Sequence, residues 1–225
     1  MERALAITGA SSGIGAATAR AAAEAGWKVA LLARSADKLQ ALVDELGADR
    51  AVAIPCDVTD AEAARAALDR AAAAWGRLDA VFANAGCGAE AAGTEAGDLD
   101  EWRRMVDLNV WGVLTTVKAA LPHLKKTRGQ MVLTGSVAGK KTLSGSVYGA
   151  TKWFVRGYAG NLAEEMKAWG GRCALLAPGM VDTAFFDEPK PDALRPEDVA
   201  AAVMFALDQP EAARIDEIGI MPNPG

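Results

Sequence analysis

The first turn of the chain reads Thr8-Gly9-Ala10-Ser11-Ser12-Gly13-Ile14-Gly15. It follows an apolar run that is typical of a buried strand, and it precedes an alanine-rich helical pattern. Glycines let the backbone turn tightly and approach a pyrophosphate, while the helix N-terminus offers unpaired N–H groups and a positive dipole end. A glycine turn can also serve only to join a strand to a helix. Its place after the first strand of an alternating pattern favours a dinucleotide-binding loop formed by Gly9, Ser11, Ser12, Gly13, Ile14 and Gly15.

Apolar runs alternate with helical patterns along the rest of the chain. Several of these runs are continuously apolar, as is expected of strands that are covered on both faces. We expect strands at Ala4–Ile7, Lys28–Ala33, Ala51–Pro55, Leu78–Ala83, Gln130–Thr134, Arg172–Ala177 and Glu217–Met221. We expect helices at Ile14–Ala25, Ala36–Leu46, Asp60–Trp75, Trp102–Lys126, Val147–Trp169 and Pro196–Leu207. The third of these helices opens with Thr59-Asp60-Ala61-Glu62, a capping-box pattern.

Alternation of this kind predicts right-handed βαβ units. The expected fold class is α/β, a Rossmann-type doubly wound parallel sheet of about seven strands with helices on both faces. No segment resembles an interdomain linker, so residues 1–225 are expected to form a single domain. In such open sheets, ligands bind beyond the carboxyl ends of the strands.

Composition narrows the classes of function. Of the 225 residues, 51% are hydrophobic, and the net charge of −5 argues against a nucleic-acid-binding protein. The chain has no run of 18 apolar residues and begins Met-Glu-Arg directly before an apolar strand, so neither a membrane span nor a signal peptide is expected. Cys56, Cys87 and Cys173 are odd in number and widely spaced, which indicates free thiols in a cytoplasmic protein. A single histidine and these cysteines predict no metal site.

A tyrosine and a lysine stand four residues apart in Tyr148-Gly149-Ala150-Thr151-Lys152, which places them on one face of a helix. Ser136 lies twelve positions upstream, just after a predicted strand. A nearby cation favours the phenolate, so we expect Lys152 to lower the pKa of Tyr148 from its usual value of about 10. Such a tyrosine can exchange a proton with an alcohol or a carbonyl oxygen. Taken alone, the same spacing also fits an ordinary pair on a helix surface.

The end of the second predicted strand bears on the choice of cofactor. NAD-binding units commonly place a carboxylate there to hold the ribose 2′-hydroxyl. Here the strand is followed by Arg34, which can clamp a 2′-phosphate, and Lys38 lies one helical turn further on. The alternative is an arginine that simply extends from a strand end into solvent. The residue types favour NADP(H) over NAD(H).

Together these segments resemble the short-chain dehydrogenase/reductase family, over nearly the whole chain. The first turn matches the cofactor loop of the family, and the matches that follow stand in the family's order and spacing. They are Asp57 in Cys56-Asp57-Val58, Asn84-Ala85-Gly86, Asn109 in Leu108-Asn109-Val110, Ser136, Tyr148, Lys152, and Pro178-Gly179 with Thr183 beyond. The resemblance implies NADP(H)-dependent interconversion of a carbonyl and a secondary alcohol, an oxidoreductase activity on CH–OH groups.

The resemblance also implies roles for these residues. Tyr148 would be the general acid in reduction and the general base in oxidation, and Ser136 would donate to the substrate oxygen. Lys152 would bond the nicotinamide ribose, and Asn109 would hold a water that links Lys152 to solvent. Cofactor contacts beyond the first turn would come from Arg34, Asp57, Val58, Asn84, Ala85, Gly86, Tyr148, Lys152, Pro178, Gly179 and Thr183.

Other functions stay open at this point. A 3-oxoacyl-carrier-protein reductase would need a basic patch beside the cleft for its acidic partner, and Lys125, Lys126, Arg128, Lys140 and Lys141 are candidates. The segment Ile218-Gly219-Ile220-Met221-Pro222 resembles a subgroup of hydroxy-acid and serine-type dehydrogenases. A dinucleotide-sensing regulatory protein would keep the fold without needing Ser136, Tyr148, Lys152 and Asn109 together.

The substrate side and the assembly can also be anticipated. Residues expected to line the substrate space are mostly small or apolar, which favours an uncharged or weakly polar carbonyl compound: Cys87, Gly88, Val137, Ala138, Leu143, Met180 and Phe185. In the family, the helices that carry Asn109 and Tyr148 pair across a subunit interface. We therefore expect a homodimer or a homotetramer.

Overall fold

The computed structural model describes residues 2–88, 93–185, 188 and 190–223. Seven strands form one sheet, in the order β3-β2-β1-β4-β5-β6-β7, and every neighbouring pair is parallel. The strands are β1 (Ala4–Thr8), β2 (Lys28–Ala33), β3 (Ala51–Pro55), β4 (Ala80–Ala83), β5 (Gln130–Thr134), β6 (Arg172–Pro178) and β7 (Glu217–Ile220).

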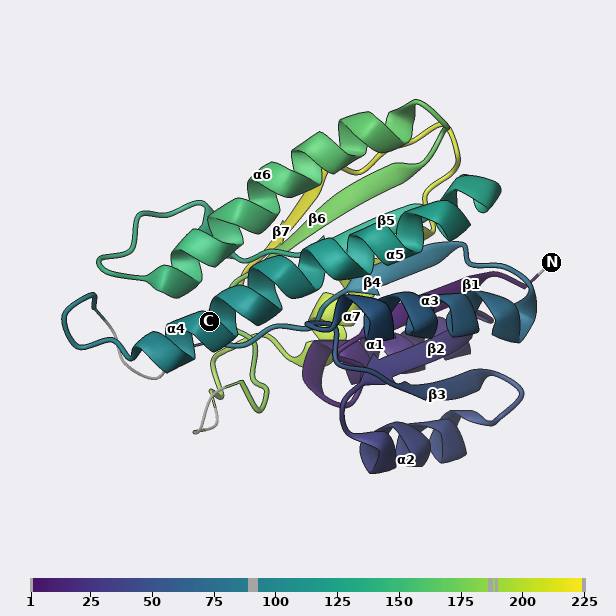
Figure 1. The fold of residues 1–225 in the computed structure, drawn as a ribbon, viewed down its shortest axis with the longest axis horizontal. Coiled ribbons are helices and arrows are strands. Elements are labelled where there is room, and N and C mark those ends of the chain that lie inside the picture. The colour runs from purple at the N-terminus through teal and green to yellow at the C-terminus, as the bar shows by residue number, and fades with distance from the viewer. Residues whose placement is uncertain (1, 89–92, 186–187, 189, 224–225) are drawn as a thin grey trace.

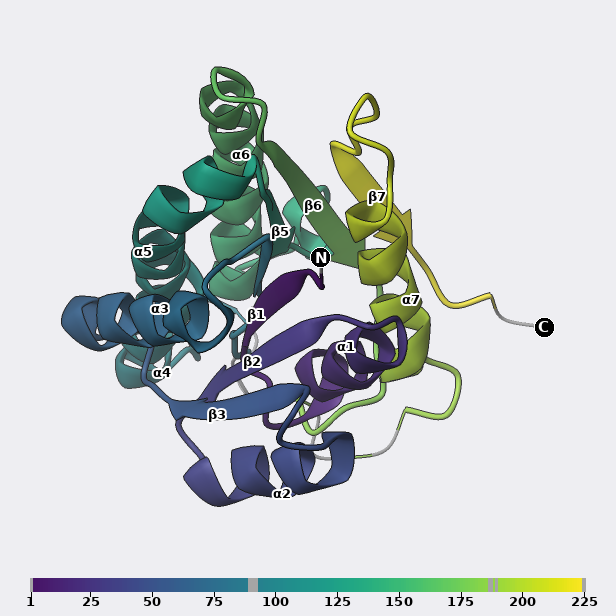
Figure 2. The ribbon, with the colours of Figure 1, turned by 90° about the vertical axis from the view of Figure 1, so that its right-hand side faces the viewer.

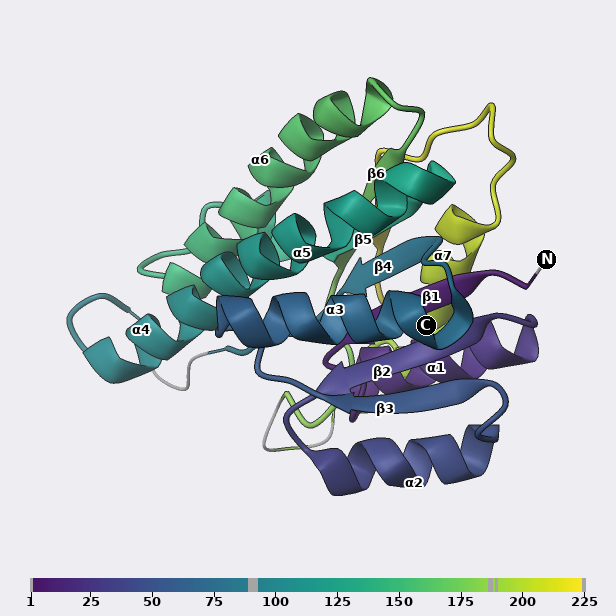
Figure 3. The same cartoon turned by 45° about the vertical axis from the view of Figure 1, so that its right-hand side comes forward.

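Helices cover both faces of the sheet (Figures 1 and 2). They are α1 (Gly13–Glu24), α2 (Ala36–Leu46), α3 (Ala61–Trp75), α4 (Leu99–Val106), α5 (Gly112–Thr127), α6 (Val147–Lys167) and α7 (Pro196–Leu207). Apolar residues of α3, α5 and α6 form one buried core, and Figure 3 shows these helices side by side. Residues of α1, α2 and α7 form a second core on the opposite face. The predicted doubly wound parallel sheet is therefore confirmed.

The direction of winding changes at β1, which pairs with β2 on one side and with β4 on the other. The chain runs outward from β1 to β3 and then returns to β4, so the helices that follow β1 and β4 lie on opposite faces of the sheet. Such a reversal leaves a crevice at the carboxyl ends of the two strands. This crevice is where the residues singled out in the sequence come together.

The segment predicted as one helix at Trp102–Lys126 extends from Leu99 to Thr127 and is not a regular α-helix throughout. Asp98 caps its start by accepting hydrogen bonds from the N–H groups of Asp100 and Glu101, at 2.8 and 2.9 Å. Between α4 and α5, residues Asp107–Trp111 form a π-helical turn. Such turns are frequent at functional sites.

The predicted capping box at the start of α3 is wrong by one residue. Asp60 is the cap, because its carboxylate accepts from the N–H groups of Glu62 and Ala63, at 2.9 and 3.0 Å. The hydroxyl of Thr59 is instead donated to Asp57, at 2.8 Å. The pattern could not show that Asp57 engages this threonine first.

Candidate active site

The first turn is built on three glycines, each with a different physical reason. Gly9 and Gly13 have φ angles of +67° and +51°, in the left-handed region that favours glycine. Gly15 lies on the first turn of α1, where an added Cβ would stand 2.3 Å from the carbonyl oxygen of Gly9. Ser12 is the N-cap of α1, yet no side chain caps this helix end. The turn therefore presents backbone N–H groups and a positive helix terminus to the crevice, which suits an anion.

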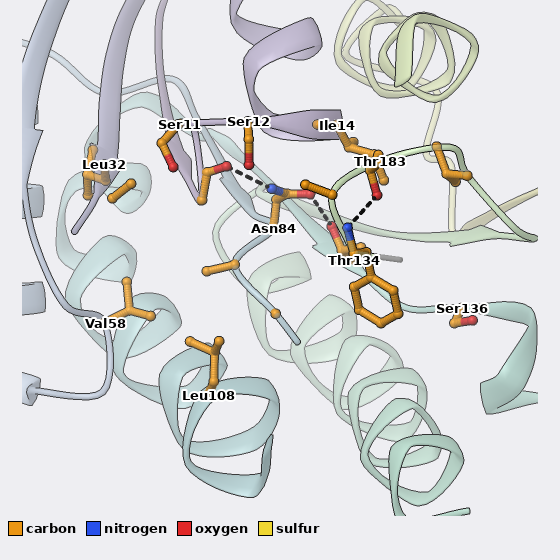
Figure 4. Close-up of a pocket in the computed structure, with 18 of the residues that line it drawn as sticks. Ser11, Ser12, Ile14, Leu32, Val58, Asn84, Leu108, Thr134, Ser136 and Thr183 are labelled. Atoms are coloured by element: carbon orange, nitrogen blue, oxygen red, sulfur yellow. Dashed lines mark hydrogen bonds between the residues drawn. The ribbon is translucent and has the colours of Figure 1, made fainter. Parts of the chain in front are cut away.

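Asn84 ties three strands together at the floor of the crevice. The N–H groups of Asn84 and Ala85 donate to the hydroxyl of Thr8, at 2.9 and 3.1 Å. The amide nitrogen of Asn84 donates to the carbonyl of Thr8 at 3.1 Å, and its amide oxygen accepts from Thr134 at 3.4 Å. Figure 4 shows Asn84 and Thr134 joined in this way. The ends of β1, β4 and β5 are thus held at fixed spacing.

A pocket of about 360 Å³ opens above this floor. Of the predicted cofactor and catalytic residues, it is lined by Gly9, Ser11, Ser12, Gly13, Ile14, Arg34, Asp57, Val58, Asn84, Ala85, Gly86, Ser136, Tyr148, Lys152, Pro178, Gly179 and Thr183. The two predicted residues outside the lining are Gly15 and Asn109. Figure 4 shows Ser11 and Ser12 from the first turn at a distance from Ser136, with Asn84 and Thr134 between them.

Ser136, Tyr148 and Lys152 meet at one end of this pocket because two short caps position them. Ser136 follows β5 and accepts from the N–H of Ala138 at 3.1 Å, at the start of the 3₁₀ turn Val137–Gly139. Ser146 caps α6 by accepting from the N–H of Gly149 at 2.9 Å, which places Tyr148 in the first turn of that helix. All three residues line the pocket.

Lys152 is 5% exposed and points to the end of β5. Its Nζ donates to the carbonyl of Thr134 at 2.9 Å and lies 5.7 Å from the ring centroid of Tyr148. Burial disfavours the charged form and lowers the pKa of Lys152 from 10.5 to about 8. At pH 7 the amine is therefore still mostly charged, but it loses its proton near pH 8 instead of near pH 10.5.

Tyr148 does not have the lowered pKa that the sequence predicted. Burial raises the pKa of its phenol, and the interaction with the Ser136 side chain, which lowers the pKa, is the smaller effect. The prediction is wrong for the protein by itself because spacing along a helix reports nearness but not desolvation. At neutral pH this tyrosine carries its proton, which is the form needed to donate to a substrate oxygen.

Asn109 is fully buried in the π-helical turn, and its side chain joins the loop after β4 to helix α6. Its amide oxygen accepts from the N–H of Cys87 at 2.9 Å, and its amide nitrogen donates to the carbonyl of Cys87 at 2.8 Å. The same nitrogen donates to Thr151 at 3.2 Å. The side chain is thus committed to backbone and to Thr151, so a water relay through this amide stays a prediction.

Arg34 and Asp57 both line the pocket. The carboxylate of Asp57 accepts from the N–H and the hydroxyl of Thr59, at 2.9 and 2.8 Å. These bonds, helped by the charge of Arg34, hold the pKa of Asp57 below its usual value against the opposing effect of burial. Arg34 is exposed and lines the pocket, whereas Lys38 is exposed on α2 and lies outside the lining.

Several lining residues were not anticipated. Thr134 holds Lys152 through its carbonyl, and its position at the last residue of a predicted strand beside Ser136 was a usable signal. Others are apolar or small and left no sequence signal: Leu32, Ala33, Ser35, Cys56, Leu108, Gly135, Val181 and Ala184. Of the residues predicted for the substrate side, Phe185 alone lines this pocket. Leu143 and Met180 are 45% and 49% exposed.

Three of the five candidates for a basic patch lie away from the pocket. Lys125 and Lys126 lie in the last turn of α5, and Arg128 precedes β5. These three residues stand at the amino edge of the sheet, while the pocket lies at the carboxyl edge. Lys140 pairs with Glu217 at the start of β7. A spread of lysines along the sequence could not show to which edge each one belongs.

Residues 2–88, 93–185, 188 and 190–223 were compared with the patterns of metal sites and of membrane-spanning helices. This part of the chain has no cluster of metal-ligating side chains. It also contains no helix with the length and apolar character needed to span a bilayer.

Burial raises the pKa of Cys56 to about 11 and of Cys173 to about 12, and it also raises that of Cys87. The three thiols are therefore poor nucleophiles at neutral pH.

Comparison with known proteins agrees with this geometry. The model of the short chain dehydrogenase family matches residues 3–193. An uncharacterized oxidoreductase of Staphylococcus aureus (strain MRSA252) is 38% identical over 221 residues, which cover 96% of this chain and 95% of that protein. The chain therefore belongs to the short-chain dehydrogenase family and is an oxidoreductase.

Two solved structures resemble the whole fold. An alcohol dehydrogenase from the archaeon Thermococcus sibiricus, complexed with 5-hydroxy-NADP, is 32% identical with a TM-score of 0.90, and 100% of each chain is covered. Serine dehydrogenase from Escherichia coli is 31% identical with a TM-score of 0.88, and 97% of each chain is covered.

Proposed function

We propose that this protein is an NADP(H)-dependent oxidoreductase that interconverts a carbonyl and a secondary alcohol. The observation that carries the proposal is the convergence of Ser136, Tyr148 and Lys152 on the pocket that begins at the glycine turn. A dinucleotide sensor needs the turn but has no use for these three groups. The similarity to an alcohol dehydrogenase bound to a modified NADP supports both the reaction and the cofactor.

The residues present fit a nicotinamide dinucleotide. Gly9 and Gly13 leave room at the turn, where a Cβ on Gly9 would meet the Cα of Ala85 at 3.0 Å and one on Gly13 would meet Thr183 at 3.1 Å. The uncapped start of α1 would hold the pyrophosphate, and Asp57 would accept from the adenine amine. Arg34 would hold the 2′-phosphate that distinguishes NADP. When bound, the cofactor supplies the hydride.

The side chains supply the proton and the electrostatic stabilisation of the charge that develops during the reaction. Tyr148 is neutral at pH 7 and donates its proton to the substrate oxygen as negative charge develops there. Ser136 donates a hydrogen bond to the same oxygen, which lowers the energy of the charged transition state. Lys152, charged below a pKa of about 8, favours the phenolate that is left behind. In oxidation the same groups act in reverse.

A second substrate class is supported by one observation. Serine dehydrogenase from Escherichia coli is nearly as similar to this chain as the alcohol dehydrogenase is. Small hydroxy acids are therefore the runner-up substrates. A carrier-protein reductase is less well supported, because Lys125, Lys126 and Arg128 stand at the edge away from the pocket.

The test is a screen of NADPH oxidation over aldehydes, ketones and 3-oxoacyl thioesters, and of NADP⁺ reduction over 3-hydroxy acids and serine. The wild type should turn over at least one class, and Tyr148→Phe should lose about a hundredfold or more in kcat, because the general acid is removed. NADPH binding, followed by fluorescence titration, should stay close to wild type in that variant. Turnover near the wild-type rate in Tyr148→Phe contradicts the mechanism.

The cofactor preference is tested in the same screen with NADH and with Arg34→Ala. Loss of a charge-assisted contact to the 2′-phosphate should weaken NADPH binding roughly ten- to a hundredfold and leave NADH binding nearly unchanged. Lys38→Ala is the matched control, since Lys38 lies outside the pocket lining. A wild type that prefers NADH contradicts the assignment of Arg34.

A further inference from the structure

Glu217, the first residue of β7, holds two cations that come from different parts of the fold. The guanidinium of Arg156 on α6 donates to both oxygens of its carboxylate, at 2.9 Å to Oε1. The Nζ of Lys140 pairs with the same carboxylate, whose side chain is 22% exposed. Burial acts to raise the pKa of Glu217, but the bonds to Arg156 and Lys140 together lower it. The carboxylate is therefore charged at neutral pH.

Lys140 closes the short turn that begins at Ser136. The N–H of Gly139 donates to the carbonyl of Ser136, and the N–H of Lys140 donates to the carbonyl of Val137, each at 3.0 Å. The turn rests on α6, because an added Cβ on Gly139 would stand 2.6 Å from the carbonyl oxygen of Lys152. A displacement at Lys140 is therefore passed to Ser136 through a short, hydrogen-bonded piece of backbone.

Arg156 stands on the helix that carries the other two reacting groups. It follows Lys152 by four residues, so the two share a face of α6, and Tyr148 lies one turn before them. Glu217 joins Lys140 to Arg156, and its carboxylate thereby links the Ser136 turn to this helix. Without that negative charge, two cations would remain beside each other. Their repulsion would push the turn away from the helix.

We propose that Glu217 is a positioning residue for the reaction, because its carboxylate fixes the Ser136 turn relative to the helix that bears Tyr148. This inference rests on the proposed function and adds to it a residue of the edge strand, outside the pocket lining. The side chains of Ser136 and Tyr148 interact, and both must reach the same substrate oxygen. A small displacement of one of them therefore lowers the rate of the reaction while the cofactor still binds.

The first experiment removes the charge and keeps the shape of the side chain. In Glu217→Gln, kcat should fall about tenfold, a fraction of the hundredfold or more that loss of an oxyanion donor costs, while the Kd for NADPH stays within about twofold of wild type. Lys140→Met should lower kcat by a similar factor, because it breaks the same link. Glu164→Gln is the matched control, since Glu164 also pairs with two cations, Lys167 and Arg214, but at the far end of α6. The control should leave kcat unchanged.

A double-mutant cycle with Ser136→Ala, measured at high enzyme concentration, tests whether the effect passes through Ser136. In that background Glu217→Gln should change kcat by no more than about twofold, because the hydroxyl that it positions is gone. The full loss of kcat in that background, or a Glu217→Gln variant as fast as the wild type, overturns this inference and leaves the proposed function standing. No turnover of any compound by the wild type overturns the proposed function and this inference together.

Discussion

Tyr148 and Lys152 show what burial does to two titratable neighbours. Desolvation disfavours whichever form is charged, so the pKa of the phenol rises and that of the ammonium falls to about 8. Both shifts favour the neutral pair in the protein alone. A bound dinucleotide with a cationic nicotinamide ring would shift the balance toward the phenolate, which couples proton release to the oxidised cofactor.

The cost of burying Lys152 predicts a stability change that depends on pH. Its pKa is lower in the folded state, about 8 against 10.5, so the unfolded chain binds more protons between these values and stability rises with pH across that window. Below pH 8 the cost of burying the charged amine lowers the free energy of unfolding by about 3 kcal/mol relative to its value above pH 10.5. Lys152→Met should therefore unfold at higher urea than the wild type at pH 7, and the difference should shrink by pH 10.5.

Urea unfolding at several pH values checks this, with Lys38→Met as the control because Lys38 is exposed on α2. That control should show no such trend. The loss of the bond to Thr134 will offset part of the gain, by about 1 kcal/mol. A Lys152→Met variant that is destabilised equally at pH 7 and at pH 10.5 would contradict a large desolvation cost.

At the scale of elements, the join between β1 and α1 depends on close backbone contact. A methyl group on Gly15 would overlap the carbonyl of Gly9, and neither atom belongs to a flexible side chain. Gly15→Ala should therefore shift the turn, lower the free energy of unfolding by about 1–3 kcal/mol and weaken NADPH binding. Gly15 acts here through the shape of the turn, since it lies outside the pocket lining.

Chemical denaturation and fluorescence titration measure these two effects. Glu24→Ala is the control, because Glu24 is exposed at the opposite end of the same helix. The control should bind NADPH as the wild type does. Unchanged binding in Gly15→Ala would show that the turn tolerates the shift.

Elements and their order were predictable, and the reasons are visible in particular residues. Continuous apolar runs such as Lys28–Ala33 fixed the strands, and Pro196 marked the start of α7 as expected. The π-helical turn around Asn109 was not predictable, because its helical spacing of apolar residues continues on both sides. The pKa of Tyr148 was missed for a related reason. Burial depends on Phe185 and other atoms that are distant in sequence.

At the scale of the whole molecule, one face of α6 lacks a partner among the described residues. Trp153 and Phe154 are 48% and 37% exposed, and Trp111 near the start of α5 is 49% exposed. On the same face, Gly157 and Gly160 have open space where a side chain would be. Large apolar groups beside small residues suit the close approach of another helix. This supports the proposed homodimer or homotetramer.

The proposal predicts that Phe154→Glu will dissociate the assembly, because a carboxylate would be buried in an apolar contact. Light scattering coupled to size-exclusion chromatography should give a multiple of the monomer mass for the wild type and a smaller mass for the variant. Phe205→Glu places the same charge on α7, on the other face of the sheet, and should leave the α6 contact intact. A monomeric wild type would contradict the proposal.

Because the sheet reverses at β1, the residues that would bind the nucleotide and the residues that would react with the substrate come from different parts of the chain. The nucleotide end is built from residues up to Val58, and the reacting end from Asn84 onward, with Thr8 and Asn84 as the joint between them. Nothing between Thr59 and Ala83 lines the pocket. A chimera that exchanges residues 2–58 for those of a relative, with Thr8 kept, would therefore inherit the relative's coenzyme while retaining its own choice of substrate. The topology therefore offers a natural junction for such a chimera between Val58 and Asn84.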